Sequence, residues 1–184
     1  MIPVLETERL ILREWRTEDF ESFAAIYADE SQARFIGCVE SRDRAWRRMA
    51  AIIGHWSLRG YGLWVVAPKI TGRFIGWAGC WNPEGYPEPE IGYCISPAHQ
   101  RQGYAREAAR AALRYAYDGF GWTEAASVIV LDNLPSICLA ESLGARFERE
   151  VDFGGSRWGV YRHLPPENVS PSNFTPKKGK LTCP

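Results

Sequence analysis

The residues best suited to chemistry lie between positions 90 and 112, in the stretch EIGYCISPAHQRQGYAREAARAA. The pattern of EIGYCIS predicts a strand, and the alanine-rich stretch after Gly103 predicts a helix. The turn Gln100–Ala105 therefore opens that helix. The first backbone N–H groups of a helix have no partner within it, and the helix dipole adds partial positive charge there. The turn is thus a candidate anion site.

Small and basic side chains around the turn fit the same interpretation. Gly103 permits close approach of a ligand to the backbone, and Ala105 adds little bulk. Arg101 and Arg106 add positive charge, so a pyrophosphate would fit there. A simpler alternative stays open, in which Gly103 only shapes the turn and the arginines are solvated. Neither a Walker loop nor a Rossmann GxGxxG after the first strand is present.

The spacing of cysteines and histidines argues against a metal centre. No CxxC pair occurs among the five cysteines, which are Cys38, Cys80, Cys94, Cys138 and Cys183. The three histidines lie far apart, at His55, His99 and His163. An odd number of scattered cysteines is typical of a reduced protein, so we expect no structural metal and a cytoplasmic location.

Length and charge limit the classes of function. The chain has 184 residues, which corresponds to about one domain. Lys and Arg together number 22, as do Asp and Glu, so the formal net charge is zero. Nucleic acids and anionic membranes both attract a basic excess, so neither partner is expected. We place one domain at residues 1–164 and a weakly ordered tail, rich in proline and lysine, at residues 165–184.

The N-terminal third predicts one strand and two helices. Residues 8–15 have the pattern of a strand near a sheet edge. Thr17 is the candidate N-cap of the first helix, and Ser41 begins the second, which Gly60 closes. Apolar residues at helical spacing mark one face of each helix: Phe20, Phe23, Ala24 and Tyr27 in the first, and Trp46, Met49, Ala50 and Ile53 in the second.

The middle of the chain predicts a strand–helix–strand unit after two further strands. Strand-like stretches lie at residues 61–67, 73–81 and 90–96, separated by turns rich in proline and glycine. The helix at 103–118 carries a narrow stripe of small residues, namely Ala105, Ala108, Ala109, Ala112 and Ala116. The apolar run at 125–131 predicts a strand buried on both faces. The unit therefore contains a parallel strand pair.

The end of the domain predicts one helix and a hairpin. Pro135 suits the first turn of the helix, and Gly144 suits its end. Two strands, at 145–153 and 157–163, flank Gly154-Gly155, which is a hairpin signal. The complete order predicts a mixed α/β fold with a central, mostly antiparallel sheet and flanking helices.

The motif Gln100-x-x-Gly103-x-Ala105 matches the Q/R-x-x-G-x-G/A motif of the GNAT superfamily of N-acetyltransferases. The segments TERLILREW, EIGY and NLPS…LGA resemble the ribosomal-protein N-acetyltransferase-like branch of that superfamily. The resemblance runs from about Glu6 to about His163. It implies a single GNAT-like domain in which the parallel strands splay apart and leave a slot for acetyl-CoA.

The resemblance also implies which residues hold the cosubstrate. The backbone of the turn would hold the pyrophosphate, the strand ending at Cys94 and Ile95 would pair with the pantetheine arm, and Asn133 would contact that arm. The candidate coenzyme-binding residues are Cys94, Ile95, Arg101, Gln102, Gly103, Tyr104, Ala105, Arg106, Asn133 and Ser136. No metal is implied.

The implied reaction is direct attack of an amine on the thioester, which needs a base for the amine and favours an acid for the thiolate. Glu90 is the candidate base, and the alternative is a surface carboxylate beside a proline loop. Ser136 is the candidate acid, because Ala140 stands where many relatives have a tyrosine. Ser136 could instead cap its helix or touch the coenzyme. Cys94 could also act as a nucleophile, but the favoured interpretation is a small, buried apolar side chain. We expect Glu90→Gln to lower turnover most at neutral pH and below.

The acceptor is harder to predict. Trp64, Trp77, Trp81 and Tyr86 could wall its pocket, and three acids at Glu84, Glu88 and Glu90 would suit a cationic amine. The favoured function is transfer of an acetyl group to a small-molecule amine or a protein N-terminus. Alternatives are a non-catalytic acyl-CoA-binding module and transfer of a longer acyl group. Relatives in this branch often dimerise, so a homodimer is a further expectation of the resemblance.

Overall fold

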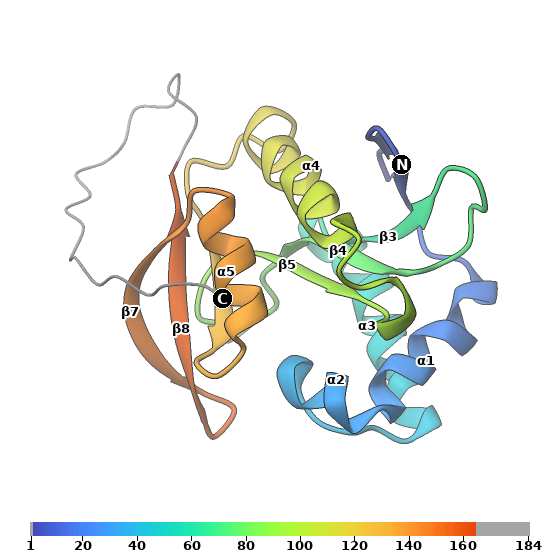
Figure 1. Cartoon of the computed structure of the whole chain (residues 1–184), viewed down its shortest axis with the longest axis horizontal. Coiled ribbons are helices and arrows are strands. Elements are labelled where there is room, and N and C mark those ends of the chain that lie inside the picture. The colour runs from blue at the N-terminus through green and yellow to red at the C-terminus, as the bar shows by residue number, and fades with distance from the viewer. Residues whose placement is uncertain (1, 165–184) are drawn as a thin grey trace.

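The computed structural model describes residues 2–164, which form one eight-stranded sheet with helices on both faces (Figure 1). The strands are β1 (Leu5–Glu6), β2 (Leu10–Arg13), β3 (Leu63–Pro68), β4 (Gly76–Trp81), β5 (Glu90–Ile95), β6 (Ala125–Val130), β7 (Arg146–Phe153) and β8 (Ser156–His163). Their order in the sheet is β1-β2-β3-β4-β5-β6-β8-β7. Within the described sheet only β5 and β6 are parallel, which confirms the mixed, mostly antiparallel architecture.

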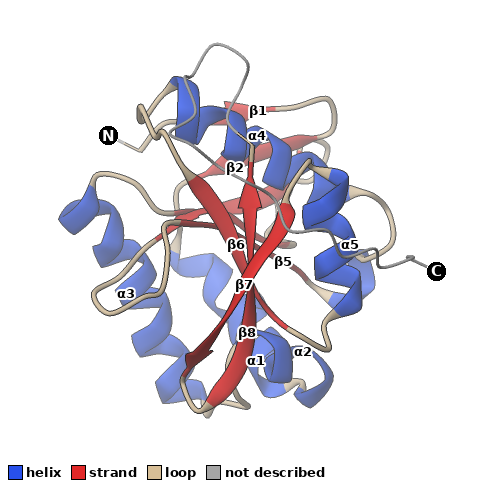
Figure 2. Ribbon diagram, turned by 90° about the vertical axis from the view of Figure 1, so that its left-hand side faces the viewer, coloured by secondary structure: helices blue, strands red, loops and turns tan. Residues whose placement is uncertain are grey.

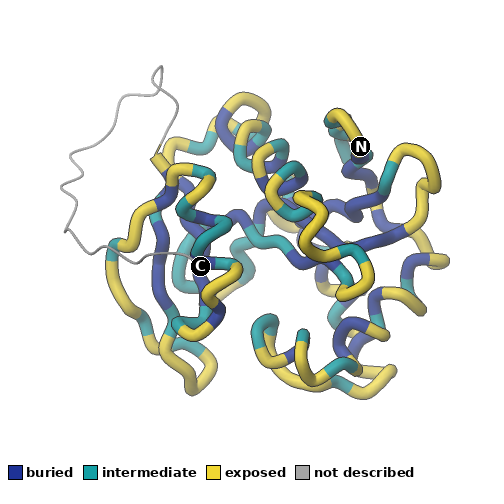
Figure 3. Tube along the Cα trace, in the orientation of Figure 1, coloured by how far each residue is buried: buried dark blue, intermediate teal, exposed yellow. Residues whose placement is uncertain are grey.

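In the described part of the chain, five α-helices cover the sheet. They are α1 (Phe20–Ala28), α2 (Glu30–Ile36), α3 (Arg42–Arg59), α4 (Tyr104–Asp118) and α5 (Leu134–Ser142). Figure 2 shows α3 and α5 on opposite sides of the strands. The sheet centre is buried and the outer helix surfaces are exposed (Figure 3), so each helix turns one side towards the sheet.

The small-residue stripe of α4 packs closely on the sheet, as its spacing predicts. Ala108, Ala109, Ala112 and Ala116 are fully buried, whereas Ala105 is half-buried. They share one apolar cluster with Ile91 on β5. Side chains this small let the helix backbone approach the strands, which holds the start of α4 against the end of β5.

The opposite face of the sheet is covered by α1 and α3, and here the predicted face of α3 is wrong. Trp46 and Ile53 are exposed, at 60% and 42% of their full areas. The buried positions of α3 are Ala45, Met49, Ile52, His55 and Trp56. This helix carries two apolar stripes, and helical spacing alone does not say which one meets the sheet.

The start of the first helix also differs from the prediction. A short 3-10 helix, Thr17–Asp19, precedes α1, and Thr17 does not cap it. The Asp19 carboxylate accepts from the backbone N–H of Arg16 (2.8 Å) and makes two 2.8 Å bonds with the Arg13 guanidinium. The sequence analysis did not predict α2, whose N-cap Asp29 accepts from the Ser31 N–H.

The C-terminal hairpin forms as predicted, with Gly154 and Gly155 both at positive φ between β7 and β8. The predicted tail at 165–184 lies outside the described residues. Within residues 2–164 no helix is long and apolar enough to cross a bilayer. The same part of the chain holds no group of three or more potential metal-binding side chains.

His163 is a buried histidine that makes stability depend on pH. Its Nε2 lies 3.0 Å from the Ser127 hydroxyl, and its Nδ1 has no partner among the described residues. Burial lowers the pKa of His163 from 6.5 to about 4. Between about pH 6.5 and 4, His163 therefore binds a proton in the unfolded chain but not in the folded chain. The free energy of unfolding falls as the pH falls through this range.

We expect His163→Gln to remove this loss, which amounts to roughly 3 kcal/mol when fully developed. Glu90, whose pKa is raised to about 7, contributes the opposite slope between about pH 4.5 and 7. The measurement is therefore the difference in unfolding free energy between wild type and variant at about pH 7.5 and about pH 5. A difference that does not change with pH would contradict this role of His163.

Candidate active site

The candidate site begins where the parallel strands separate. The only pairing between β5 and β6 is Glu90 with Ala126, and beyond it the strands diverge. Side chains satisfy the backbone groups left at this point: the Ser127 hydroxyl donates to Ile91 O (3.0 Å), and the Val128 N–H donates to Glu90 Oε2 (3.0 Å). These two bonds stabilise the buried point where β5 and β6 separate, because backbone groups without partners there would cost free energy of folding.

Among residues 2–164, Glu90 is the only carboxyl group that lines the cleft beyond this split. Its side chain is buried, which excludes the surface-carboxylate alternative. Its Oε1 accepts from the Tyr86 hydroxyl (2.9 Å), while Oε2 accepts from Val128. Burial raises the pKa of Glu90 to about 7, although both hydrogen bonds favour the charged form. A carboxyl group with this pKa can exchange a proton near neutral pH.

The cleft has a volume of about 610 Å³ and runs from α2 and α3 on one side to the β7–β8 hairpin on the other. Its lining brings together Glu90, Asn133 and Ser136, which are far apart in the sequence. Gly79 on β4 lies opposite Gly92 on β5, and a Cβ on Gly92 would come within 3.1 Å of Glu90 Oε1. The missing side chain at Gly92 leaves room beside the carboxylate.

The predicted anion turn lies outside that lining, at the start of α4. Arg101 has φ of 58° and Gly103 has φ of 81°, so the turn is left-handed at two positions. Only Arg101 among the described non-glycine residues has a positive φ. The Gln100 side chain donates to Ile95 O (2.9 Å) and thereby ties the turn to the end of β5. Arg101, Gln102 and Gly103 are exposed, as an anion site requires, and so is Arg106.

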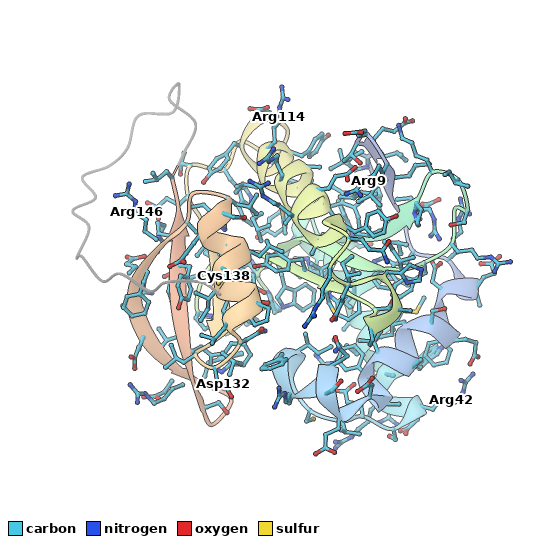
Figure 4. All side chains as sticks on the ribbon, in the orientation of Figure 1. Arg9, Arg42, Arg114, Asp132, Cys138 and Arg146 are labelled. Carbon is cyan, nitrogen blue, oxygen red and sulfur yellow. The ribbon has the colours of Figure 1, made fainter. Side chains whose placement is uncertain are left out.

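A brace from the N-terminal segment holds this turn, and the sequence analysis missed it. Arg9 Nη1 donates to Gln102 O (2.9 Å), and Arg9 Nε bonds Glu107 Oε2 (2.7 Å). The guanidinium carbon also lies 4.6 Å from the ring centre of Tyr104. Thr7 donates to the other Glu107 oxygen at 2.6 Å. Figure 4 shows Arg9 beside α4.

This brace also neutralises a carboxylate in the first turn of α4, where negative charge would oppose an anionic ligand. We expect Arg9→Gln to weaken coenzyme binding about fivefold, the effect of a lost charge-assisted contact. Adding Glu107→Gln to that variant should restore much of the affinity, because the freed charge is removed. Titration calorimetry with coenzyme A measures both effects, and unchanged affinity in folded Arg9→Gln would contradict the brace.

Cys94 and Ile95 both point into the core rather than into the cleft. Cys94 packs in the cluster under α1 and α3, and Ile95 packs in the cluster under α4. Only their backbone groups could meet a ligand in the gap between the strands, and Ile95 O already accepts from Gln100. Burial raises the pKa of the Cys94 thiol to about 12, which is the reverse of what a nucleophilic cysteine needs.

Three of the four predicted aromatic wall residues line the cleft. Trp77, Trp81 and Tyr86 do so, whereas Trp64 is fully buried in the cluster under α4 and donates to Pro3 O (2.7 Å). Sequence reasoning did not predict Phe153 and Trp158 of the final hairpin, which also line the cleft. That hairpin pairs with β6, so only the folded sheet brings it to the cleft.

The predicted acidic surface for a cationic acceptor does not form. Glu84 is fully exposed and pairs with Arg59 (3.3 Å). Glu88 pairs with both Arg149 and Arg162. Neither carboxylate lines the cleft.

Comparison with known proteins identifies the family of the chain. The family model described as an acetyltransferase (GNAT) domain matches residues 9–146, more than two thirds of the chain. The chain belongs to the GNAT acetyltransferase family. This GNAT protein is therefore an acetyl-CoA-dependent acyltransferase, and acetyl-CoA is the cosubstrate that the family uses.

Similar proteins span nearly the whole chain. YoaA of Bacillus subtilis (strain 168), named an uncharacterized N-acetyltransferase, is 28% identical over 174 residues, 93% of each chain. An acetyltransferase from Agrobacterium tumefaciens str. C58 superposes with a TM-score of 0.83 at 26% identity, covering 90% of this chain and 96% of its own. RimL, a ribosomal L7/L12 alpha-N-protein acetyltransferase in complex with coenzyme A, shares the fold: its TM-score is 0.71 at 16% identity, with coverages of 88% and 98%.

The helix after β6, α5, has Ala140 at the position where the resemblance leads one to expect a tyrosine. Ala140 is fully buried against Ile129 and Ile137, so no polar group from that position reaches the cleft. The N-cap of α5 is Asn133, whose side chain accepts from the Ser136 N–H (3.3 Å), so Ser136 does not cap the helix. Ser136 lines the cleft, as does Tyr93, whose hydroxyl donates to Ser136 O (2.9 Å).

Proposed function

We propose that this GNAT protein transfers the acetyl group of acetyl-CoA to a primary amine, with Glu90 as the general base. The single observation that carries the proposal is the buried Glu90 carboxyl, with a pKa raised to about 7, in a cleft that also reaches Asn133 and Ser136. A base with a pKa near the working pH combines the correct protonation state with useful basicity.

In the proposed reaction the neutral amine attacks the thioester carbonyl. A C–N bond forms, the C–S bond breaks, and coenzyme A leaves as a thiolate. Glu90 takes the proton that the amine loses, directly or through one water molecule. The thiolate takes up a proton from solvent, directly or through the Ser136 hydroxyl, which regains its own proton from solvent.

We propose that acetyl-CoA is bound by the turn that carries the motif Gln100-x-x-Gly103-x-Ala105. The backbone of Arg101, Gln102, Gly103, Tyr104 and Ala105 would hold the pyrophosphate at the start of α4, with Arg106 adding charge. The left-handed Gly103 supports this assignment, because a glycine there leaves the backbone open to phosphate. The backbone of Cys94 and Ile95 would face the pantetheine arm between the splayed strands, and Asn133 would contact that arm.

Two hydroxyl groups could assist the leaving thiolate. Ser136 is favoured, because Asn133 rather than Ser136 caps α5 and because Ser136 lines the cleft. Tyr93 is the second candidate, since it also lines the cleft, but burial raises the pKa of its phenol and its proton is engaged by Ser136 O. Comparing Ser136→Ala with Tyr93→Phe in single-turnover experiments separates the two.

The acceptor is a small-molecule amine or a protein N-terminus. The test is thiol release from acetyl-CoA across a panel of amines that includes peptides with different N-termini, run beside equilibrium binding of coenzyme A. We expect turnover with at least one class of amine. Tight coenzyme binding without turnover on any amine would favour the alternative, a non-catalytic acyl-CoA-binding module.

Three further expectations remain predictions: the domain boundary at residue 164, the cytoplasmic location and a homodimer. Size-exclusion chromatography with light scattering would measure the last of these.

A further inference from the structure

The charges that line the cleft are unevenly placed. Among its lining residues only Glu90, Arg34 and Arg48 are charged. Glu90 lies at the split of the sheet, whereas the two arginines come from α2 and α3. With the pKa of Glu90 raised to about 7, the lining carries a net positive charge at neutral pH.

The two arginines differ in how they are compensated. Arg48 bonds the Glu40 carboxylate, which is nearly buried, and its guanidinium carbon lies 4.9 Å from the Tyr27 ring centre. Arg34 is exposed, and its guanidinium carbon lies 4.2 Å from the Phe35 ring centre. Arg34 makes no ion pair with any described residue, so its charge is free for a ligand.

The Tyr27–Trp77 ring pair gives the position of Arg48 relative to Glu90. The C-terminal end of α2, which carries Arg34, lies beside Arg48, because a Cβ on its C-cap Gly37 would come 3.5 Å from Arg48 Nη2. Tyr27, beside Arg48, stacks on Trp77 with ring centres 5.7 Å apart and planes within 4°. Trp77 on β4 lies opposite Cys94, and Trp81 lies opposite Glu90. Trp81 follows Trp77 by four positions along β4, a length of roughly 13 Å. The cation end and the base therefore lie apart, with Gly79 and Gly92 between them.

We propose that the acceptor carries a carboxylate besides its amine, and that Arg34 binds this carboxylate while the amine is directed towards Glu90. Planar guanidinium groups bind carboxylates through paired hydrogen bonds, and the Phe35 ring holds the Arg34 group at the cleft. Arg48, whose charge is neutralised by Glu40, has a structural role at that end of the cleft. This inference rests on the proposed function and names its substrate class.

The competing use of Arg34 is in coenzyme binding. Gln32, on the same helix, accepts from the Gln100 side chain of the anion turn (2.7 Å), so α2 also approaches the phosphate end. An arginine that served the phosphates would change the affinity for acetyl-CoA and leave the choice of acceptor unchanged. The two roles are therefore separable by kinetics.

The experiment compares matched acceptors with the full chain. A series of ω-amino carboxylates of increasing length is assayed against the corresponding amides and diamines, and rates are compared per neutral amine, because the end group changes the pKa of the amine in the short members. We expect the wild type to favour the best carboxylate over its amide by at least about tenfold in kcat/KM. Arg34→Gln should abolish this preference without changing the KM for acetyl-CoA. Arg44→Gln, at an exposed arginine on α3 that does not line the cleft, is the control and should keep it.

Equal rates for carboxylate and amide in the wild type, or a preference for diamines, would overturn the inference and leave the proposed function intact. An Arg34→Gln variant that raises the KM for acetyl-CoA and keeps the preference would assign Arg34 to the coenzyme instead. A wild type that acetylates no amine at all would overturn the proposed function together with this inference.

Discussion

Glu90→Gln is expected to lower kcat/KM at about pH 8 by at least about 100-fold, because general base catalysis typically contributes roughly 10²–10⁴-fold. Glutamine keeps the shape of the side chain and can still accept from Val128 or Tyr86, but it cannot take a proton. The wild type should lose activity as the pH falls through about 7, where Glu90 becomes protonated. The variant should lack this dependence.

Because the pKa of Glu90 is raised to about 7, the pH range in which Glu90→Gln has its largest effect differs from the range that the sequence alone predicts. The sequence alone predicts the greatest loss at neutral pH and below, but there the wild-type carboxyl is itself protonated. The difference should instead be largest between about pH 7 and the pKa of the amine. Glu84→Gln is the matched control, because Glu84 is fully exposed on the loop that precedes β5. An unaltered pH–rate profile in Glu90→Gln would rule out Glu90 as the base.

Gly103→Val is expected to weaken coenzyme A binding by at least about tenfold, or about 1.4 kcal/mol. The φ of 81° is strained for a residue with a branched side chain, and a Cβ there would come 3.2 Å from Arg9 Nη2. The substitution therefore disturbs both the backbone of the turn and the arginine that braces it. Titration calorimetry with coenzyme A measures the change.

Gly60→Val separates backbone strain from loss of the coenzyme site. Gly60 has φ of 77° at the end of α3, and a Cβ there meets no atom within 4 Å. Both variants should lose about 1–2 kcal/mol of stability from the left-handed backbone. Only Gly103→Val should lose coenzyme affinity. Equal affinities in the two folded variants would contradict the placement of the pyrophosphate.

The sequence predicts α4, β6 and the final hairpin well, because their patterns are local. The alanine stripe of α4, the buried β6 and the Gly154-Gly155 hairpin each depend on residues close together in the chain. The parallel pair follows from the order of those elements, and the structure confirms it. The apolar face of α3 could not be predicted in this way, because the helix has two candidate faces and only the sheet selects one.

The details of the candidate site depend on contacts between distant residues. Glu90 is marked by its place at the start of a strand, yet one of its two hydrogen bonds comes from Val128, 38 positions away. The Arg9–Glu107 pair joins residues 98 positions apart, and no local pattern links them. Similarly, the pairing of Glu88 with Arg149 and Arg162 removes an acidic surface that composition alone suggests.

The central claim is that the acetyl group moves directly from acetyl-CoA to an amine. Its most direct test is a single-turnover experiment that follows free coenzyme A and the intact mass of the protein. With acetyl-CoA alone we predict no release of coenzyme A and no acetylated protein. Once an accepted amine is added, coenzyme A and acetylated amine should appear in equal amounts. Release of coenzyme A with acetylation of the protein before any amine is present would contradict direct attack.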